Sequence, residues 1–154
     1  MRRKLALIAG VAAAALAVLL GHAPAAHADE GVDGASCTGG CSETVNQSAY
    51  SVLAFRNWCT SGSTGSSTTT QPTCTVDGVA QQWSWISPGN QTPSGQDWDG
   101  FRVDAGWCYN VTFYSYIYGF SWRTYNRVGA SHLYVKVSND ATAYVTAQRY
   151  GSCP

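Results

Sequence analysis

Hydrophobic and polar residues alternate along much of the chain after residue 50, which is the pattern of half-buried β-strands. The alternation is clearest in 101–113, where two sets of alternating apolar residues flank Gly106. This glycine predicts a bulge or kink between two strands. Further strands are predicted, in chain order, at 50–58, 82–86, 115–118, 120–127, 132–137 and 142–150.

No window of the domain carries a helical period over three turns, and short segments of turn-forming residues separate the predicted strands. The stretch 61–71 is almost wholly serine, threonine and glycine. Because Cys59 and Cys74 flank it, we interpret it as a surface loop rather than an interdomain linker. Residues 49–154 are therefore expected to form one all-β domain, a small disulfide-stapled sandwich or barrel.

The first 28 residues have the layout of a signal peptide. Three basic residues near the start precede the apolar run 5–20, and Ala26 and Ala28 supply the small residues that a signal peptidase needs. The apolar run is short for a membrane anchor, which is the alternative interpretation. We therefore expect a secreted, extracellular protein that begins at Asp29 and has no membrane span.

Removal of this segment changes the charge of the protein. Three of the nine basic residues precede Asp29, whereas Asp29 and the residues after it include all nine acidic residues. Six basic and nine acidic residues therefore remain, and the net charge is −3. Nucleic acids and anionic membranes are bound by basic surfaces. The sequence offers no such surface, so neither class of partner is expected.

All six cysteines follow the predicted signal peptide, and an even number in an exported chain predicts three disulfides. Six cysteines allow fifteen pairings. We favour Cys59–Cys74, Cys108–Cys153 and Cys37–Cys41. A zinc site at Cys37, Cys41 and His132 is the alternative, but its spacing is poor. No metal or other cofactor is expected.

The segment 29–48 is small, polar and acidic, and it contains no aromatic residue. Such a composition buries little apolar surface, which predicts a flexible N-terminal arm. Thr38, Gly39 and Gly40 form a turn between two cysteines, and Asp33 and Glu43 add negative charge. These five residues are candidates for binding a partner protein. The alternative is a disordered tail with a stapled end.

The sequence contains no catalytic motif, and we expect no enzymatic activity. His132 is the one histidine after the signal peptide and lies in a strand pattern, where a structural role is the usual one. Asp97 and Asp99 alternate with Trp98 and Gly100. We favour a turn whose aspartates accept backbone hydrogen bonds. A calcium site and a glycosidase pair are the alternatives.

Three tyrosines spaced by two, Tyr114, Tyr116 and Tyr118, are predicted to share one face of a strand. Tyrosine is favoured where one side of a ring is dry and the other meets a partner. This face is therefore a candidate binding surface, for protein or for the apolar faces of sugars. The alternative is that the three rings form the core and its rim.

Three motifs of the chain are similar to those of small secreted bacterial proteins: "RNWC" at 56–59, the serine- and threonine-rich loop 61–70, and "TPSGQDWDGFRVDAGWCY" at 92–109. The chain resembles the small adaptor subunits (UmbB type) of umbrella toxin particles. The resemblance implies a non-enzymatic β-rich subunit. Such a subunit links a repeat-containing toxin polypeptide to a lectin-bearing subunit with a degenerate trypsin-like domain. It also implies that the arm enters the cleft of a partner and that the sheet docks on the repeats.

The expected function is accordingly that of a secreted adaptor in an antibacterial toxin complex used in interbacterial competition. A free-standing carbohydrate-binding module is the first alternative. A secreted protease inhibitor, which also uses a stapled exposed loop, is the second.

Overall fold

The structure is a computed structural model that describes Cys37 and residues 40–154. These residues contain no helix, and hence none that could cross a bilayer. Within them the chain forms nine strands: β1 (Glu43–Asn46), β2 (Val52–Phe55), β3 (Ser67–Thr68), β4 (Trp83–Ile86), β5 (Gly100–Val103), β6 (Trp107–Ser115), β7 (Gly119–Asn126), β8 (Leu133–Lys136) and β9 (Ala141–Tyr150).

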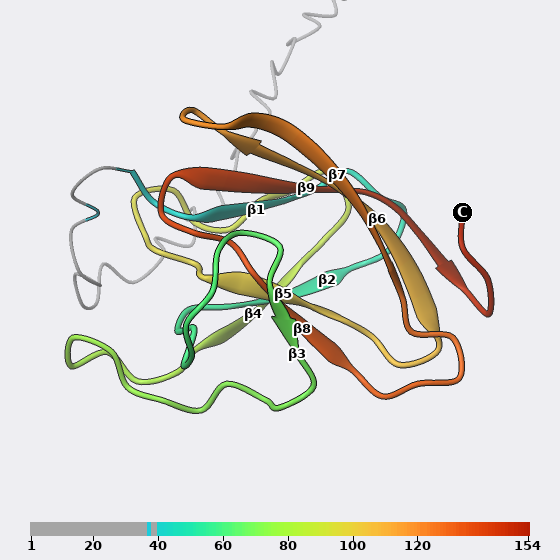
Figure 1. Ribbon diagram of the computed structural model, residues 1–154, viewed down its shortest axis with the longest axis horizontal. Helices are drawn as coiled ribbons and strands as arrows, with labels where there is room; N and C mark the ends of the chain where they lie inside the picture. Colours follow the sequence, from blue (N-terminus) through green and yellow to red (C-terminus); the bar gives the residue numbers. More distant parts are fainter. Residues whose placement is uncertain (1–36, 38–39) are drawn as a thin grey trace, which may run out of the picture. The chain divides into compact units, whose positions relative to one another are not determined.

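The strands form two sheets that pack face to face, so the predicted all-β fold is confirmed and it is a sandwich. Sheet A has the order β1-β9-β6-β7, and sheet B has the order β3-β8-β5-β2-β4. In Figure 1 sheet A lies in the upper part of the view and sheet B in the centre. The ring of Phe101 on sheet B lies 6.3 Å from Phe113 and 6.2 Å from Tyr125 on sheet A. These contacts form the centre of the hydrophobic core.

Gly106 lies between two strands, as predicted, and it forms a turn there rather than a bulge. It lies in the turn that takes the chain from β5 in sheet B to β6 in sheet A, with φ +82°. Its amide donates a hydrogen bond to the carbonyl of Arg127. The bulge lies instead in the pairing of β6 with β9, between Asn110 and Val111. The glycine therefore provides the left-handed conformation that the change of sheet requires.

The prediction of a strand at 115–118 is wrong. Ser115 is the last residue of β6, and 116–118 form the tight turn between β6 and β7. The register of the two strands runs without interruption from Ser115 opposite Gly119 to Cys108 opposite Asn126. The hydroxyl of Ser115 accepts hydrogen bonds from the amides of Ile117 and Tyr118. Gly119 then takes φ +72° and starts the return strand. Side-chain bonding to the turn amides thus ends the strand, a signal that alternation does not contain.

All three predicted disulfides are confirmed. The Cα–Cα distances are 5.1 Å for Cys37–Cys41, 5.6 Å for Cys59–Cys74 and 4.8 Å for Cys108–Cys153. The second disulfide closes the loop between β2 and β4, and the third ties the C-terminal residues to the buried start of β6. Cross-links between distant segments restrict the unfolded chain, which favours the folded state.

The expectation that the arm extends to Ser48 is wrong for its last residues. Residues 43–46 form β1, which pairs in parallel with β9. Its inward-facing residues are polar instead of apolar, and Ser42, Thr44, Asn46 and Ser48 are all buried. Apolar periodicity therefore could not reveal this strand, because its buried face is made of hydroxyl and amide groups.

Specific hydrogen bonds explain how Asn46 of β1 buries its polar side chain. The side-chain nitrogen Nδ2 of Asn46 donates to the carbonyls of Tyr50 and Ile86, at 2.7 and 2.9 Å. The side-chain oxygen of Asn46 accepts bonds from the amide and the hydroxyl of Ser48. Gln148 of β9 donates to the same hydroxyl at 2.5 Å. A buried polar group costs little when its partners are present, so β1 is held by hydrogen bonds more than by apolar contacts.

Candidate functional site

The most unusual surface of the described chain lies on the β6–β7 hairpin. Six of its nine residues from 114 to 122 are large, apolar and exposed, and we call them the hairpin patch: Tyr114, Tyr116, Ile117, Tyr118, Phe120 and Trp122. Figure 1 shows the turn of this hairpin at the upper edge of the view. The rings of the patch are exposed to solvent: the exposed fraction is 74% for Trp122 and 84% for Tyr118.

Strand register places the rings of the patch beside one another. Tyr114 pairs with Phe120, and their ring centroids are 4.9 Å apart. Phe120 stacks in turn on Trp122 at 6.4 Å, because alternate residues of a strand share a face. The row lies on the outer face of sheet A, opposite to the face that carries Phe113 and Tyr125 into the core, and its rings are exposed there.

The three predicted tyrosines are exposed, but they do not form one strand face. Of the three, Tyr114 lies in a strand, whereas Tyr116 and Tyr118 belong to the turn. Sequence reasoning missed Phe120 and Trp122, which complete the row. The alternation in FSWRT places these two rings on one face of a strand. Their hydrophobicity, however, favours a buried face over an exposed one.

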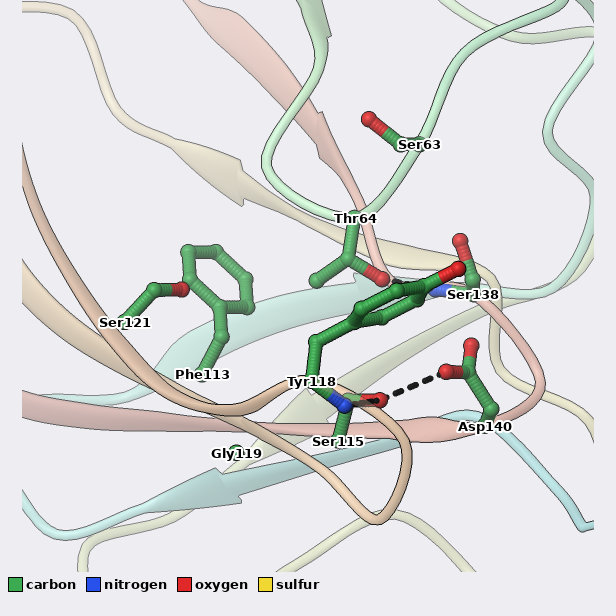
Figure 2. Close-up of a pocket in the computed structure, with 9 residues that line it drawn as sticks. All are labelled: Ser63, Thr64, Phe113, Ser115, Tyr118, Gly119, Ser121, Ser138 and Asp140. Carbon is green, nitrogen blue, oxygen red and sulfur yellow. Dashed lines mark hydrogen bonds between the residues drawn. The ribbon is translucent and has the colours of Figure 1, made fainter.

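A pocket opens on the inner side of the same hairpin (Figure 2). It has a volume of about 320 Å³. The lining residues come from both strands, from the loop before β3 and from the β8–β9 turn: Ser63, Thr64, Phe113, Ser115, Tyr118, Gly119, Ser121, Ser138 and Asp140. In Figure 2 the carboxyl group of Asp140 and the ring of Phe113 lie on opposite sides of the view, with the ring of Tyr118 between them.

The loop that forms one wall of this pocket is fixed by hydrogen bonds. The hydroxyl of Thr64 accepts a bond from the amide of Ser138 at 3.0 Å. Tyr125 donates from its hydroxyl to the carbonyl of Gly65, also at 3.0 Å. Lys136 donates from its ammonium to the carbonyl of Gly62 at 2.8 Å. This wall of the pocket is therefore in place before any ligand arrives, which lowers the entropic cost of binding.

A second, shallower concavity of about 360 Å³ lies beside Trp122. The polar groups of its lining include Asn110 and Thr124, whose side chains are joined by a hydrogen bond of 2.8 Å. Thr146 donates to the carbonyl of Asn110 at the bulge. The concavity thus combines one exposed indole with an amide and several hydroxyl groups.

The predicted partner-binding residues of the arm fall into two groups. Asp33, Thr38 and Gly39 lie outside the described residues. Gly40 is exposed with φ +115°, and Glu43 begins β1 and accepts a hydrogen bond of 2.6 Å from Gln91. Glu43 is therefore part of the domain and not of an arm.

Asp97 and Asp99 accept backbone hydrogen bonds, so the favoured interpretation of this pair is confirmed. Asp97 accepts from the amide of Ser42 at 3.0 Å, and Asp99 accepts from the amide of Trp58 at 2.7 Å. Burial, and then the neighbouring carboxylate of Asp97, raise the pKa of Asp99 from 3.8 to about 6. In the part of the chain that the structure describes, no three acidic, histidine or cysteine side chains gather as a metal site.

His132 has a structural contact. Its Nδ1 accepts a hydrogen bond of 3.0 Å from the amide of Ala105, in the turn between the two sheets. Asp104 of the same turn pairs with Arg102 at 2.6 Å and lies 3.5 Å from the same histidine nitrogen. The imidazole thus caps a turn, as a lone histidine in a strand pattern often does.

Comparison of the chain with protein-family profiles, with curated proteins and with solved structures found no match.

Proposed function

We propose that the chain is a secreted, non-enzymatic adaptor that binds other secreted proteins through the hairpin patch. The resemblance to umbrella toxin adaptors supplies the class of partner: a lectin-bearing trypsin-like subunit and a repeat-containing toxin polypeptide. The same resemblance assigns the arm, now shortened to 29–41, to the cleft of one partner. The hairpin patch is then the surface for the other partner.

The observation that carries this proposal is the concentration of exposed rings on one hairpin. Six of the eleven exposed large hydrophobic residues of the described chain lie between 114 and 122. Soluble proteins rarely expose contiguous apolar patches unless the patch binds something. Aromatic residues are also the residues most enriched in protein–protein interfaces, where they act as anchors.

The cysteine chemistry supports export. All six cysteines are paired, and such a set of disulfides forms and persists in oxidising compartments. A non-enzymatic role is supported by the contacts of the polar residues considered for catalysis. His132, Asp97 and Asp99 all hold backbone amides in place.

The proposal is tested by capture of partners from culture supernatant. The wild-type protein is compared with a double variant, Phe120→Thr with Trp122→Thr, since threonine keeps the β propensity of the edge strand. We expect the variant to capture at least about tenfold less of one partner, because it lacks two aromatic anchor residues. Trp85→Thr is the matched control, because Trp85 is an exposed tryptophan of sheet B. Undiminished capture by the double variant would contradict the proposal.

Carbohydrate binding is a second candidate, supported by the concavity beside Trp122. Sugars stack on exposed indoles and bond to amide and hydroxyl groups, and this surface has both. A glycan array of the isolated protein separates the two functions. A carbohydrate-binding module binds glycans by itself and loses them on Trp122→Thr, whereas an adaptor shows little glycan binding without its partners.

A further inference from the structure

The pocket under the hairpin carries one acidic group in otherwise neutral surroundings. Its lining comprises five hydroxyl side chains of serine and threonine, one glycine, the rings of Phe113 and Tyr118, and the carboxyl group of Asp140. One carboxyl oxygen, Oδ2, accepts a hydrogen bond of 2.6 Å from Ser115. The other oxygen has no hydrogen-bond donor among the described residues.

No cationic side chain of the described chain balances this carboxylate. The ion pairs found there both involve Asp104. Lys136, the nearest lysine in sequence, directs its ammonium group to the carbonyl of Gly62. A carboxylate with one oxygen free of protein donors, in a pocket lined by neutral side chains, can form charge-assisted hydrogen bonds with a cation.

From this geometry we infer that the pocket takes one basic side chain, a lysine or an arginine, of the protein partner. The inference rests on the proposed adaptor function and names the chemistry of the partner's anchor. The methylene stem of the basic residue packs against Phe113 and Tyr118, as such stems do along apolar surface. Its charged group reaches Asp140 and the hydroxyl of Ser138.

Charge complementarity favours a basic anchor over a neutral one. Among the residues of the hairpin patch and of the pocket lining, Asp140 is the one with an ionisable acidic or basic group that a partner covering both would meet, apart from the tyrosine hydroxyls. The chain after residue 28 also carries nine acidic and six basic residues, which attracts cationic groups. Binding through Asp140 would fix the orientation of the partner on a patch that is otherwise apolar.

The test is an NMR titration of the disulfide-bonded, ¹⁵N-labelled protein with small probes. The probes are N-acetyl-lysine methylamide, N-acetyl-arginine methylamide and the uncharged analogue N-acetyl-norleucine methylamide, with a set of methyl pyranosides. We expect a basic probe to shift the amide signals of Ser115, Tyr118 and Ser138 in a saturable, salt-sensitive way. Asp140→Asn should weaken this binding about tenfold, the usual value of a charge-assisted hydrogen bond.

The Asp140→Asn variant keeps an oxygen that accepts from Ser115, so the turn is preserved. Asp77→Asn is the matched control, since it removes one carboxylate outside the pocket at a left-handed position that asparagine tolerates. Equal binding of the norleucine probe would overturn the inference, as would binding of a pyranoside without binding of a basic probe. Absence of shifts with both basic probes at about 100 mM, far above the millimolar affinity range of weak ligands, would also overturn it.

Partner capture separates failure of this inference from failure of the adaptor function. If Asp140→Asn retains a partner that the Phe120 and Trp122 double variant loses, the adaptor function stands and the basic anchor is wrong. If a basic probe binds the pocket but the wild-type protein captures no partner, the site is real and the adaptor function is wrong.

Discussion

Asp97 accepts two hydrogen bonds from Ser42, which lies 55 positions earlier in the chain. The backbone amide is 3.0 Å and the hydroxyl 2.5 Å from the same carboxyl oxygen. The amide of Trp98 donates back to the carbonyl of Ser42 at 3.2 Å. This exchange fixes the start of β1 against the segment before β5, although neither residue is apolar.

Substitution of Asp97 should therefore destabilise the protein. We expect Asp97→Ala to lower the free energy of unfolding by about 2 kcal/mol, the usual cost of losing charge-assisted hydrogen bonds to a partly buried amide. Urea denaturation followed by tryptophan fluorescence measures this. Asp77→Asn, which removes a carboxylate elsewhere on the surface, should leave the midpoint unchanged. An unchanged midpoint for Asp97→Ala would mean that β1 is held by other contacts.

Because of Asp99, the free energy of unfolding should depend on pH and should be larger at acidic pH. Its pKa is about 6 in the folded protein against 3.8 ordinarily, so the folded state binds the proton more tightly. The resulting stabilisation is fully present below pH 3.8 and is lost as the pH rises through 6. We expect its loss to be on the order of 1 to 2 kcal/mol, since solvent screens a partly exposed group.

Asp99→Asn tests this dependence, because the asparagine oxygen still accepts the bond from the amide of Trp58. The variant should gain stability relative to wild type at pH 7 and lose that advantage near pH 4. Denaturation curves at both pH values give the difference directly. A pH-independent difference between the two proteins would show that the carboxyl group of Asp99 titrates normally.

Gly100 should not tolerate a side chain. A Cβ atom there would overlap the carbonyl oxygen of Val135 and the ring of Phe55, both in the packed interior. We expect Gly100→Ala to cost about 3 kcal/mol or more, or to prevent folding, as severe overpacking does. Gly89→Ala is the control: φ is +79° and the site is open, so backbone strain of about 1 kcal/mol is the cost. Thermal unfolding of both variants distinguishes packing from strain.

Truncation should locate the true start of the domain. Deletion of 29–41 removes Cys37 and Cys41 together, so it leaves no unpaired thiol and retains β1. We expect that variant to unfold at nearly the wild-type temperature while losing one partner. Deletion of 29–48 should instead cost more than about 3 kcal/mol, because it leaves several buried polar groups unsatisfied. Calorimetry of the two variants checks the expected stabilities, and partner capture checks the expected loss of one partner. Equal stability of the two variants would contradict the role of β1.

Alternation of apolar residues was enough to predict the fold class and most strands. It succeeds for β5, β6 and β9 because their inner residues, such as Phe101 and Val111, are apolar and reach the core. The same reasoning fails at β1, where Thr44 and Asn46 occupy the buried positions. It also fails at 115–118, where the hydroxyl of Ser115 binds two turn amides.

Part of the candidate site could be predicted from the sequence. Tyr114, Tyr116 and Tyr118 are near one another in the chain, so their density predicted a binding surface. The pocket was not predictable, because Thr64 and Asp140 belong to two loops that are separated from the hairpin in the sequence and meet it only in the fold. Likewise Trp122 has the character of a core residue, and it is exposed because it lies on the outer face of sheet A, opposite to the face that carries Tyr125 into the core.

The parallel pairing of β1 with β9 sets the order in which the domain can assemble. Gln148 of β9 donates a side-chain hydrogen bond to Ser48, two residues after the end of β1, and the two residues are 100 positions apart. Contacts this distant in sequence form late, since closing so long a loop costs entropy before any contact repays it. A chain that emerges N-terminus first must therefore keep the polar residues of β1 hydrated until β9 is complete. Hydroxyl and amide side chains remain soluble while β1 is unpaired, whereas an apolar strand left unpaired for as long would be prone to aggregate.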